Sequence, residues 1–305
     1  MDRDLRLGTR GSPLALAQAH QAAAAIAAAN GLAPGAIEIV AMTTSGDVNL
    51  DRPLAEIGGK ALWTKELDRA LAEGVVDFCV HSMKDVESER PAGFRIAAIL
   101  PRADVRDRLV GAESIDALPD GATVGSSSPR RAAQLLRLRP DLQIVSIRGN
   151  VQTRIDKVAA GEFDATLLAA AGLDRLGLKV GVPMPVSVIL PAPGQAAIGV
   201  ECRRDEGALA DMLAAASHAP SHDCVTAERA FTRALGGTCA SPVAALAEVE
   251  GGELLLRCAI YSTDGADIVA DEFRLNPGDD GQAEELARSM LRRAPQSIRS
   301  LFDGS

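Results

Sequence analysis

The sequence predicts an α/β protein in which two similarly built α/β domains precede a small α+β domain with a three-stranded antiparallel sheet. Short apolar segments alternate with helical segments through the first two thirds of the 305 residues, and this alternation is typical of parallel sheets covered by helices. A related order of strand, loop and helix returns from residue 121. After residue 223 the pattern changes to three alternating strands separated by glycine-containing turns, which indicates hairpins.

The first domain is expected to begin with a strand at Leu5–Gly8 and a helix that runs from Ser12 to Asn30. Serine is a favoured N-cap, proline is favoured in the first helical turn, and Gly31 ends the helical pattern. Strands covered on both faces are mostly apolar, so the apolar segment at 75–80 is expected to be an internal strand of the sheet. The further elements expected here are a strand at 37–40, a helix at 65–71 and an apolar strand at 75–80.

The second domain repeats this order with a strand at 122–125 and a helix that opens at Pro129. A strand is expected at 142–147, a helix at 150–160 and a further strand at 163–170. Four prolines within residues 182–194 predict a crossing between domains, and the apolar strand at 197–201 is expected to return to the first domain.

The third domain is expected to contain a helix at 225–234, strands at 243–250, 253–261 and 267–275, and a closing helix at 283–293. Gly251-Gly252 and Asp264-Gly265 are favourable hairpin turns. The predicted domains are therefore residues 1–98 with 197–215, residues 103–190, and residues 220–305. Two tandem α/β domains that face each other correspond to a periplasmic-binding-protein-like arrangement.

The composition limits the classes of function. The net charge of −9 and the aromatic content of 3% argue against a general binder of nucleic acids or anionic membranes, which needs a broad positive surface or rings for stacking. No apolar run reaches the roughly 18 residues of a membrane helix, and the charged start Met1–Asp4 resembles neither a signal nor a transit peptide. We expect a cytoplasmic monomer that binds neither nucleic acid nor membrane.

The chain has five cysteines, at positions 79, 202, 224, 239 and 258. An odd number without a C-x-x-C pair fits neither a disulfide framework nor a zinc ribbon, and it favours a reducing compartment. His218 and His222 lie near Cys224, but the HExxH pattern is absent and Pro220 interrupts the spacing. We therefore expect no metal site.

Arginines gather in loops that are expected at the carboxyl ends of strands. Ligands of open parallel sheets bind at these ends, and loops that lead into helix N-termini attract anions. The loops span residues 9–12, 81–86 and 126–131, and the arginines in or near them and at the next strand-to-helix junction are Arg10, Arg130, Arg131, Arg148 and Arg154. Because arginine binds carboxylates with two hydrogen bonds, they predict a cleft for a substrate with several carboxylates or phosphates. The alternative is a set of solvated arginines at helix starts.

The segment His81-Ser82-Met83-Lys84-Asp85 follows the apolar strand of the first domain. Burial raises the pKa of a carboxyl group and nearby cations lower it, so Asp85 beside Lys84 is suited to tuned proton transfer. The alternative is a loop aspartate that caps a turn. No G-x-S-x-G motif surrounds Ser82, so a Ser–His hydrolase is unsupported.

Cys239 lies in a loop rich in small residues, Gly236–Pro242. Small neighbours leave the thiol accessible, which suits covalent attachment of a group. The alternative is a buried structural cysteine.

Seven motifs, in order along the chain, resemble those of the porphobilinogen deaminase (hydroxymethylbilane synthase) family. They are Thr9-Arg10-Gly11-Ser12-Pro13-Leu14-Ala15, Gly58-Gly59-Lys60-Ala61-Leu62-Trp63-Thr64-Lys65-Glu66-Leu67, His81-Ser82-Met83-Lys84-Asp85-Val86, Gly125-Ser126-Ser127-Ser128-Pro129-Arg130-Arg131, Arg148-Gly149-Asn150-Val151, Leu190-Pro191-Ala192-Pro193-Gly194-Gln195, and Gly237-Thr238-Cys239 with Pro242. They cover nearly the whole chain, and their order makes the resemblance specific.

The resemblance implies a three-domain transferase (EC 2.5.1.61) with a dipyrromethane cofactor bound covalently to Cys239. Such enzymes join four porphobilinogen molecules head to tail, release ammonia each time, and free hydroxymethylbilane for tetrapyrrole and haem biosynthesis. Asp85 matches the catalytic carboxyl group, which stabilises the positive azafulvene and pyrrolium nitrogens and takes part in proton transfer. The positions that match carboxylate-binding or polar loop contacts are Arg10, Ser12, Lys84, Arg102, Ser126, Ser128, Arg130, Arg131, Arg148, Arg154 and Arg175. Secondary candidates are Asp47, Lys60, Trp63 and Gln195.

Some positions depart from the family pattern. Glu87-Ser88 stands where proline often follows the Asp85 motif, Trp63 where phenylalanine is common, and Pro129 where leucine is common. The resemblance also implies that the product is passed to uroporphyrinogen-III synthase. The alternative function is a non-catalytic small-anion-binding protein of the two-domain α/β type.

Overall fold

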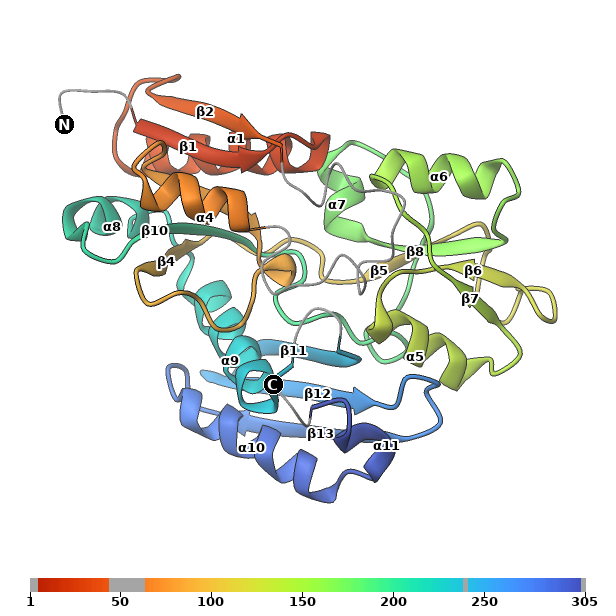
Figure 1. The fold of residues 1–305 in the computed structure, drawn as a ribbon. Coiled ribbons are helices and arrows are strands. Elements are labelled where there is room, and N and C mark those ends of the chain that lie inside the picture. The colour runs from red at the N-terminus through yellow and green to blue at the C-terminus, as the bar shows by residue number, and fades with distance from the viewer. Residues whose placement is uncertain (1–4, 44–63, 238–240, 303–305) are drawn as a thin grey trace.

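The first lobe of the computed structural model is built on a five-stranded sheet (Figure 1). The structure describes residues 5–43, 64–237 and 241–302. In spatial order the strands are β2 (Ile37–Met42), β1 (Leu5–Arg10), β3 (Phe78–Ser82), β10 (Ile198–Arg203) and β4 (Phe94–Ile99). β1 is parallel to β2 and β3, whereas β10 runs antiparallel to both of its neighbours.

A second five-stranded sheet has the same design. Its order is β7 (Gln143–Val145), β6 (Thr123–Gly125), β8 (Ala165–Ala169), β5 (Asp107–Val110) and β9 (Val182–Pro183). β6 is parallel to β7 and β8, and β5 is antiparallel to β8 and β9. The two sheets therefore match strand for strand, which confirms the predicted pair of similarly built α/β units.

Both sheets are mixed, which corrects the expectation of parallel sheets. The antiparallel strand, β10 or β5, is in each case the first strand after the chain has crossed between the sheets, at residues 100–106 and 184–197. A strand that enters from the other lobe can run in either direction, because no helix within the same lobe connects it to its neighbour. The predicted return of the chain to the first sheet is confirmed by the pairing of β10 with β3.

The third sheet is the antiparallel meander that the sequence predicts. β11 (Val243–Glu250), β12 (Glu253–Tyr261) and β13 (Ile268–Leu275) pair in sequence order. Gly251 and Gly252 both have positive φ, as a two-residue hairpin loop with primed-turn geometry requires. α9 (Ala219–Leu235) and α10 (Asp280–Arg293) cover one face and share its apolar core, and α11 (Gln296–Arg299) follows α10.

Helices cover the two larger sheets. In the first lobe these are α1 (Pro13–Ala29), α4 (Lys65–Ala72) and α8 (Gly207–Ala214). In the second they are α5 (Pro129–Leu138), α6 (Val151–Ala159) and α7 (Ala170–Arg175). The predicted N-cap is confirmed, since the Ser12 hydroxyl accepts a hydrogen bond from the backbone N–H of Ala15.

Three predicted starts of elements were wrong by three residues or more. The helix expected at 283–293 begins at Asp280, because the Asp279 side chain caps it through the Gln282 N–H. The strand expected at 75–80 begins at Phe78 because Gly74, with positive φ, turns the chain, and the Asp77 carboxylate accepts a bond from the Arg6 backbone N–H. The helix expected at 225–234 begins at Ala219, because His218 caps it through the Ser221 N–H and proline is tolerated in a first turn. The expected domain boundaries stay a prediction.

One buried carboxylate joins all three sheets. Glu228 of α9 is 0% exposed and accepts two bonds, of 2.6 and 3.0 Å, from the Arg102 guanidinium in the first crossing. It also accepts bonds from the backbone N–H groups of Gly194, in the second crossing, and Ala247, on β11. Arg102 donates in addition to the Gln195 carbonyl. Residues far apart in sequence are thus held at one point.

We predict that Glu228→Ala lowers the free energy of unfolding by about 3–5 kcal/mol, because it leaves a buried arginine and two buried N–H groups without their partner. Urea unfolding followed by circular dichroism measures the change. Glu285→Ala, which removes an exposed ion pair of α10 with Arg292, is the matched control, and it should cost less than about 1 kcal/mol. Equal losses in the two variants would contradict the prediction.

Candidate active site

The segment after β3 turns at once into the 3₁₀ helix η1 (Met83–Asp85). The backbone N–H of Met83 donates to the Ala197 carbonyl at 3.0 Å, so the second crossing holds the start of this turn. Gly194 has a φ of +70°, and a Cβ there would lie 3.0 Å from Met83 backbone and 3.2 Å from the Lys84 nitrogen. Glycine is required for this close approach, which fixes the place from which Asp85 projects.

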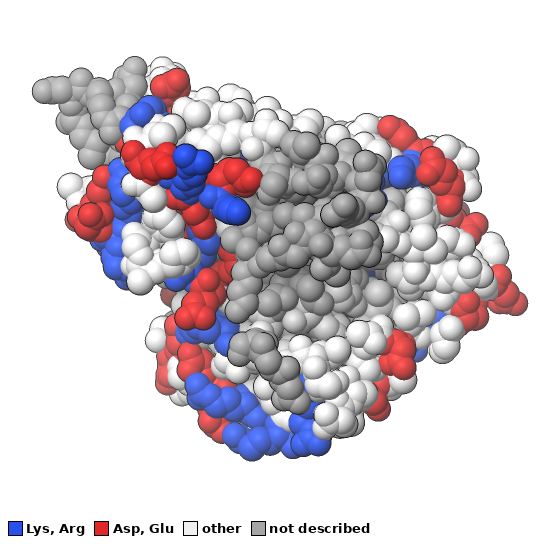
Figure 2. All heavy atoms as spheres, viewed as in Figure 1, with Lys and Arg blue, Asp and Glu red and all other residues white. Residues whose placement is uncertain are grey.

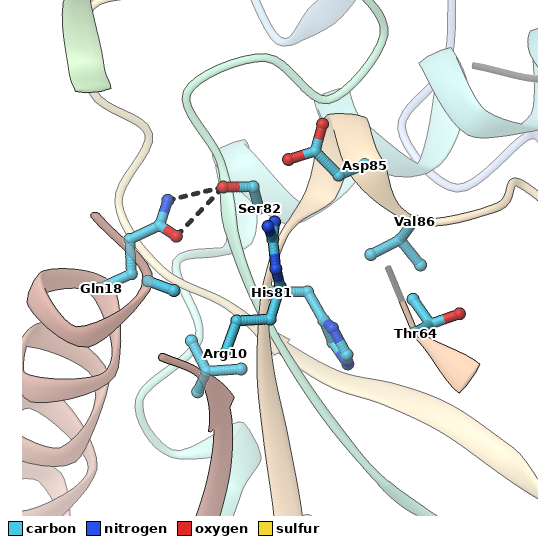
Figure 3. Close-up of a pocket in the computed structure, with 9 residues that line it drawn as sticks. Arg10, Gln18, Thr64, His81, Ser82, Asp85 and Val86 are labelled. Carbon is cyan, nitrogen blue, oxygen red and sulfur yellow. Dashed lines mark hydrogen bonds between the residues drawn. The ribbon is translucent and has the colours of Figure 1, made fainter. Parts of the chain in front are cut away.

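Asp85 lines a pocket at the carboxyl ends of β1 and β3 (Figure 3). In the figure Asp85 stands at the end of the β3 ribbon, and Gln18 and Arg10 approach from the side of α1 and β1. The lining also includes Ala15, Thr64, Val80, His81, Ser82 and Val86. The structure thus brings a carboxylate and a guanidinium, both expected from the sequence, to the rim that open sheets use for ligands.

His81 and Ser82 are held by other side chains of the first lobe. The Ser82 hydroxyl and the Gln18 side-chain amide exchange hydrogen bonds of 2.8 and 3.0 Å. The His81 Nε2 lies 3.1 Å from a carboxylate oxygen of Glu201 on β10, and both of these side chains are buried. Their partners are fixed groups of the protein, which fits a scaffolding role for this pair.

An arginine behind His81 connects the pocket wall to α4. Arg90 donates to both carboxylate oxygens of Glu201, at 2.8 and 2.9 Å, and to Asp68 at 2.5 Å. It also donates to Glu87 at 2.8 Å, and Glu87 accepts from the Thr64 hydroxyl at 3.2 Å. Glu87, which departs from the family pattern, is therefore engaged in this network. The pKa of Glu201 is lowered to about 2 by its bonds to His81 and Arg90, which outweigh the effect of burial.

α9 grips the loop that follows Asp85. The Arg229 guanidinium donates to the backbone carbonyls of Val86, Glu87 and Ser88, at 3.2, 2.6 and 3.3 Å. Burial lowers the pKa of Arg229 to about 10. Beneath the same loop, Val225 of α9 belongs to an apolar cluster with Met83 and Val86. The third lobe therefore supports the turn that carries Asp85.

The charges around Asp85 come from both α/β lobes. Burial lowers the pKa of Lys84 to about 8, and Arg131 and Arg130 act in the same direction, whereas Asp85 and Asp107 oppose it. These effects place cations of the second lobe within electrostatic range of the Lys84 ammonium group.

The pKa of Arg154, on α6, is affected by charged groups of the same site. Burial lowers its pKa to about 10, with Arg131 and Arg148 acting in the same direction, while the negative charge of Asp85 opposes the shift. Its Nε donates to the Gly149 carbonyl at 2.9 Å. Arg154 of the second lobe therefore lies within electrostatic range of Asp85.

Arg130 and Arg131, in the first turn of α5, share one buried partner. Asp107 accepts from Arg130 at 2.8 Å and from Arg131 at 2.6 Å, and its carboxylate is fully buried. Gln195 donates to Asp107 at 3.0 Å and to the Val105 carbonyl at 2.7 Å. Arg130 also donates to the Leu190 carbonyl. This cluster links both crossings to α5.

The other predicted residues occupy structural junctions. Arg175, at the end of α7, donates to the carbonyl of Ala196, the only described non-glycine residue with positive φ. Ser128 caps α5, and the Ser126 hydroxyl accepts from the Ser128 backbone N–H. Arg148 precedes α6, and Arg102 is bound by Glu228. Pro129 occupies the first turn of α5.

Cys239, Asp47, Lys60 and Trp63 lie outside the described residues. The other four cysteines are buried. Burial raises the pKa of each of these four thiols, in Cys224 to about 11. Raised pKa values and burial make them poor nucleophiles.

Ion pairs on the surface contrast with those at the site. Figure 2 shows basic and acidic side chains side by side around the rim of one face. On α10, Arg288 and Arg292 pair with Glu284 and Glu285 in this way. Exposed ion pairs contribute little to stability. The strong electrostatic interactions are therefore those of the buried charged groups near Asp85. In the described ranges, no group of three or more His, Cys, Asp or Glu side chains could hold a metal ion, and no helix could span a membrane.

The sequence analysis missed Asp107, Glu201, Arg90, Glu228 and Arg229. Glu201 could have been recognised from the sequence, because it is the one acidic residue within the apolar strand Ile198–Arg203, and a buried charge needs a partner. The others could not be recognised in this way, since their partners are distant in sequence: Arg90 and Glu201 are 111 residues apart, and Arg229 and Val86 are 143 apart.

Comparison with known proteins assigns the whole chain to one group of relatives. A family model described as "Porphobilinogen deaminase, dipyromethane cofactor binding domain" matches residues 5–211, and one described as "Porphobilinogen deaminase, C-terminal domain" matches residues 222–293. Proteins named porphobilinogen deaminase are 56% identical in Sphingopyxis alaskensis and 50% identical in Paracoccus denitrificans, each over 99% of this chain and 97% of the relative.

Solved structures add only a distant likeness. The periplasmic VFT2 domain of Bordetella pertussis BvgS overlaps 70% of this chain and 86% of its own, with 18% identity and a TM-score of 0.40. At this TM-score the likeness carries no weight for function.

We predict that the buried carboxylate of Glu201 makes stability depend on acid. Its pKa is about 2 in the folded protein, below the usual 4.5, so it contributes stability above pH ~4.5 that is lost as the pH falls toward ~2. The free energy of unfolding should therefore fall less steeply below pH ~4.5 in Glu201→Gln than in the wild type. Urea titrations at several pH values measure the slopes.

The control for this prediction is Glu206→Gln, which changes a partly exposed carboxylate that pairs with Arg203 on the same lobe. Its slope should match that of the wild type. Parallel slopes for Glu201→Gln and the wild type would contradict the prediction.

Proposed function

The chain belongs to the porphobilinogen deaminase family, and from this premise we propose that it is a hydroxymethylbilane synthase. It joins four porphobilinogen molecules head to tail on a dipyrromethane primer, releases ammonia at each addition, and then releases hydroxymethylbilane for tetrapyrrole biosynthesis. The observation that carries the proposal is the position of Asp85 in a pocket at the sheet edge, within range of buried cations from both α/β lobes.

The cations fit the side chains of the substrate and of the cofactor. Porphobilinogen carries acetate and propionate groups, so an oligopyrrole accumulates negative charge as it grows. Within residues 5–43, 64–237 and 241–302, the Nε atoms of Arg131 and Arg175 are buried without a hydrogen-bond partner, and such donors are costly unless a ligand satisfies them. We propose that these arginines, with Lys84, Arg10, Arg148 and Arg154, hold the carboxylates.

The dipyrromethane, when bound, supplies the pyrrole carbon to which the first substrate unit is joined. We propose that its attachment residue is Cys239. The four described cysteines are buried and have raised pKa values, which leaves Cys239 as the remaining thiol. α9 ends at Leu235, four residues before Cys239, and the same helix holds the loop after Asp85 through Arg229. The attachment loop thus follows directly from the element that supports Asp85.

We propose that Asp85 stabilises the positive charge that develops during the reaction. As the aminomethyl C–N bond of porphobilinogen breaks, the amine leaves with a proton and positive charge develops on the pyrrole nitrogen. A carboxylate fixed beside that nitrogen stabilises this charge and can take the proton that the new C–C bond displaces. Because the surrounding cations hold the substrate's carboxylates, one site can favour both the anions and the transient cation.

The proposed function also concerns the reaction class, the compartment and the domains. We propose that the activity is that of EC 2.5.1.61, that the enzyme works as a cytoplasmic monomer, and that uroporphyrinogen-III synthase uses the product. The proposed domains are residues 1–98 with 197–215, 103–190 and 220–305. A non-catalytic anion-binding protein is the rival function, and it requires neither a covalent cofactor nor Asp85.

The intact mass of the purified protein tests the cofactor. We expect the mass to exceed that of the chain by two linked pyrrole units, and Cys239→Ser to remove the increment, because the thioether can no longer form. Cys224→Ser, which changes a buried cysteine, should keep the increment. An unmodified wild-type mass in active protein would exclude a covalent cofactor.

We predict that Asp85→Asn lowers kcat for hydroxymethylbilane formation by about 10²–10⁴, the range that general acid–base groups contribute. The amide keeps the shape of the side chain but loses its charge and its proton-accepting capacity. Asp174→Asn, on α7, changes an exposed partner of Arg108 and should leave kcat near that of the wild type. Near-normal turnover by Asp85→Asn would remove this residue from the mechanism.

A further inference from the structure

Asp107 is placed to act on the substrate side of the site although it does not face the pocket. It is the first residue of β5, immediately after the first crossing, and it is 0% exposed. One oxygen accepts from Arg130 at 2.8 Å, and the other accepts from Arg131 at 2.6 Å and Gln195 at 3.0 Å. Both oxygens are therefore occupied by donors of the protein, and no substrate group can reach them directly.

The two arginines differ in how they are held. Both terminal nitrogens of Arg130 are bound, one to Asp107 and one to the Leu190 carbonyl. Among the described residues, the Arg131 side chain has Asp107 as its only hydrogen-bond partner, whereas the Nε atoms of both arginines are buried without one. A charge-assisted bond to a fixed carboxylate restricts the rotamers of a guanidinium. The direction in which Arg131 presents its remaining N–H groups thus depends on Asp107.

Asp107 also sets the local charge. Arg130, Arg131 and Lys84 supply three positive charges, and Asp85 and Asp107 are the acidic groups that act on Lys84 in return. Asp85 belongs to the reacting site, so Asp107 is the fixed negative charge among these groups.

We propose that Asp107 is a positioning residue for porphobilinogen: by orienting Arg130 and Arg131 and by balancing the charge around Lys84, it determines how strongly this side of the site holds the substrate's carboxylates. The inference rests on the proposed function, because it assumes that these cations bind porphobilinogen. It assigns a residue that acts through three others and touches no reacting atom.

A purely structural role makes a different prediction. If Asp107 only neutralises two buried arginines, its loss lowers stability and leaves the substrate dependence of the folded enzyme unchanged. If it positions the cations, its loss also changes KM and the pH at which KM rises. The pH dependence separates the two roles because it reports the charge state of Lys84.

The sign of the pH effect follows from the groups that surround Lys84. Its pKa is about 8, lowered by burial, Arg131 and Arg130 and raised by Asp85 and Asp107. In the wild type, KM should rise as the pH passes about 8, because Lys84 loses the charge that attracts carboxylate. Asp107→Asn removes one of the two negative charges that raise this pKa, so the rise in KM should begin at lower pH.

The experiment compares wild type and Asp107→Asn as holoenzymes, checked by intact mass, with kcat and KM for porphobilinogen measured across neutral and alkaline pH. We expect KM of Asp107→Asn at neutral pH to increase roughly tenfold, as for the loss of one well-oriented charge-assisted bond. The rise in KM should move by about half a pH unit or more toward lower pH. kcat should change far less than KM, because Asp85 is intact.

The matched control is Asp141→Asn, in the same lobe, where an exposed carboxylate pairs with Arg139; its KM and pH profile should equal those of the wild type. Asp107→Glu keeps the charge but displaces the carboxylate, so KM should rise while its alkaline rise stays at the wild-type pH. If Asp107→Asn does not fold as a holoenzyme, the KM of Asp107→Glu tests the positioning role instead.

The outcomes separate this inference from the proposed function. An active wild type with unchanged KM and pH profile in Asp107→Asn overturns the positioning role alone, as does a wild-type KM in Asp107→Glu when only that variant folds. A wild type that carries the cofactor mass but forms no hydroxymethylbilane overturns the proposed function, and the positioning role with it.

Discussion

The buried carboxylate of Glu228 is the interaction on which the arrangement of the three lobes depends. It binds the first crossing through Arg102, the second through the Gly194 N–H, and the third sheet through the Ala247 N–H. A buried charge is tolerated only when donors surround it, so these three segments must meet at this point in the folded protein. The second crossing then packs on Met83 and Lys84, which places Asp85.

A second consequence of burial is a division of labour among carboxylates. Glu228, Asp107 and Glu201 are completely buried and bound by arginines, so they hold other groups in place. Asp85 lines the pocket, where a reacting group can reach it. The same residue type thus serves as anchor or as reactive group according to how much of its bonding capacity the protein occupies.

The third lobe also takes part in the site. α9 supplies Glu228 to the crossings and Arg229 to the loop after Asp85, one residue apart on the same helix. The helix ends at Leu235, and the left-handed conformation of Gly236 terminates it three residues before Cys239. The proposed attachment residue therefore follows, in the sequence, the helix that holds the loop after Asp85.

The sequence by itself determined the alternation of elements, the repeat, the antiparallel third sheet and the segment that carries Asp85, because local periodicity, caps and turns are written in neighbouring residues. Ser12, Gly31 and the Gly251-Gly252 turn are of this kind. The motifs around Arg10, Asp85 and Arg131 also identified the family before any geometry was known.

Only the tertiary structure decided that both sheets are mixed, and that Asp107, Glu201, Arg90, Glu228 and Arg229 support the site. The direction of β5 and β10 follows from crossings between lobes, which leave no periodic pattern. The function of a buried charge depends on its partners, and here most of the partners lie tens to more than a hundred residues away, where no local pattern in the sequence connects them.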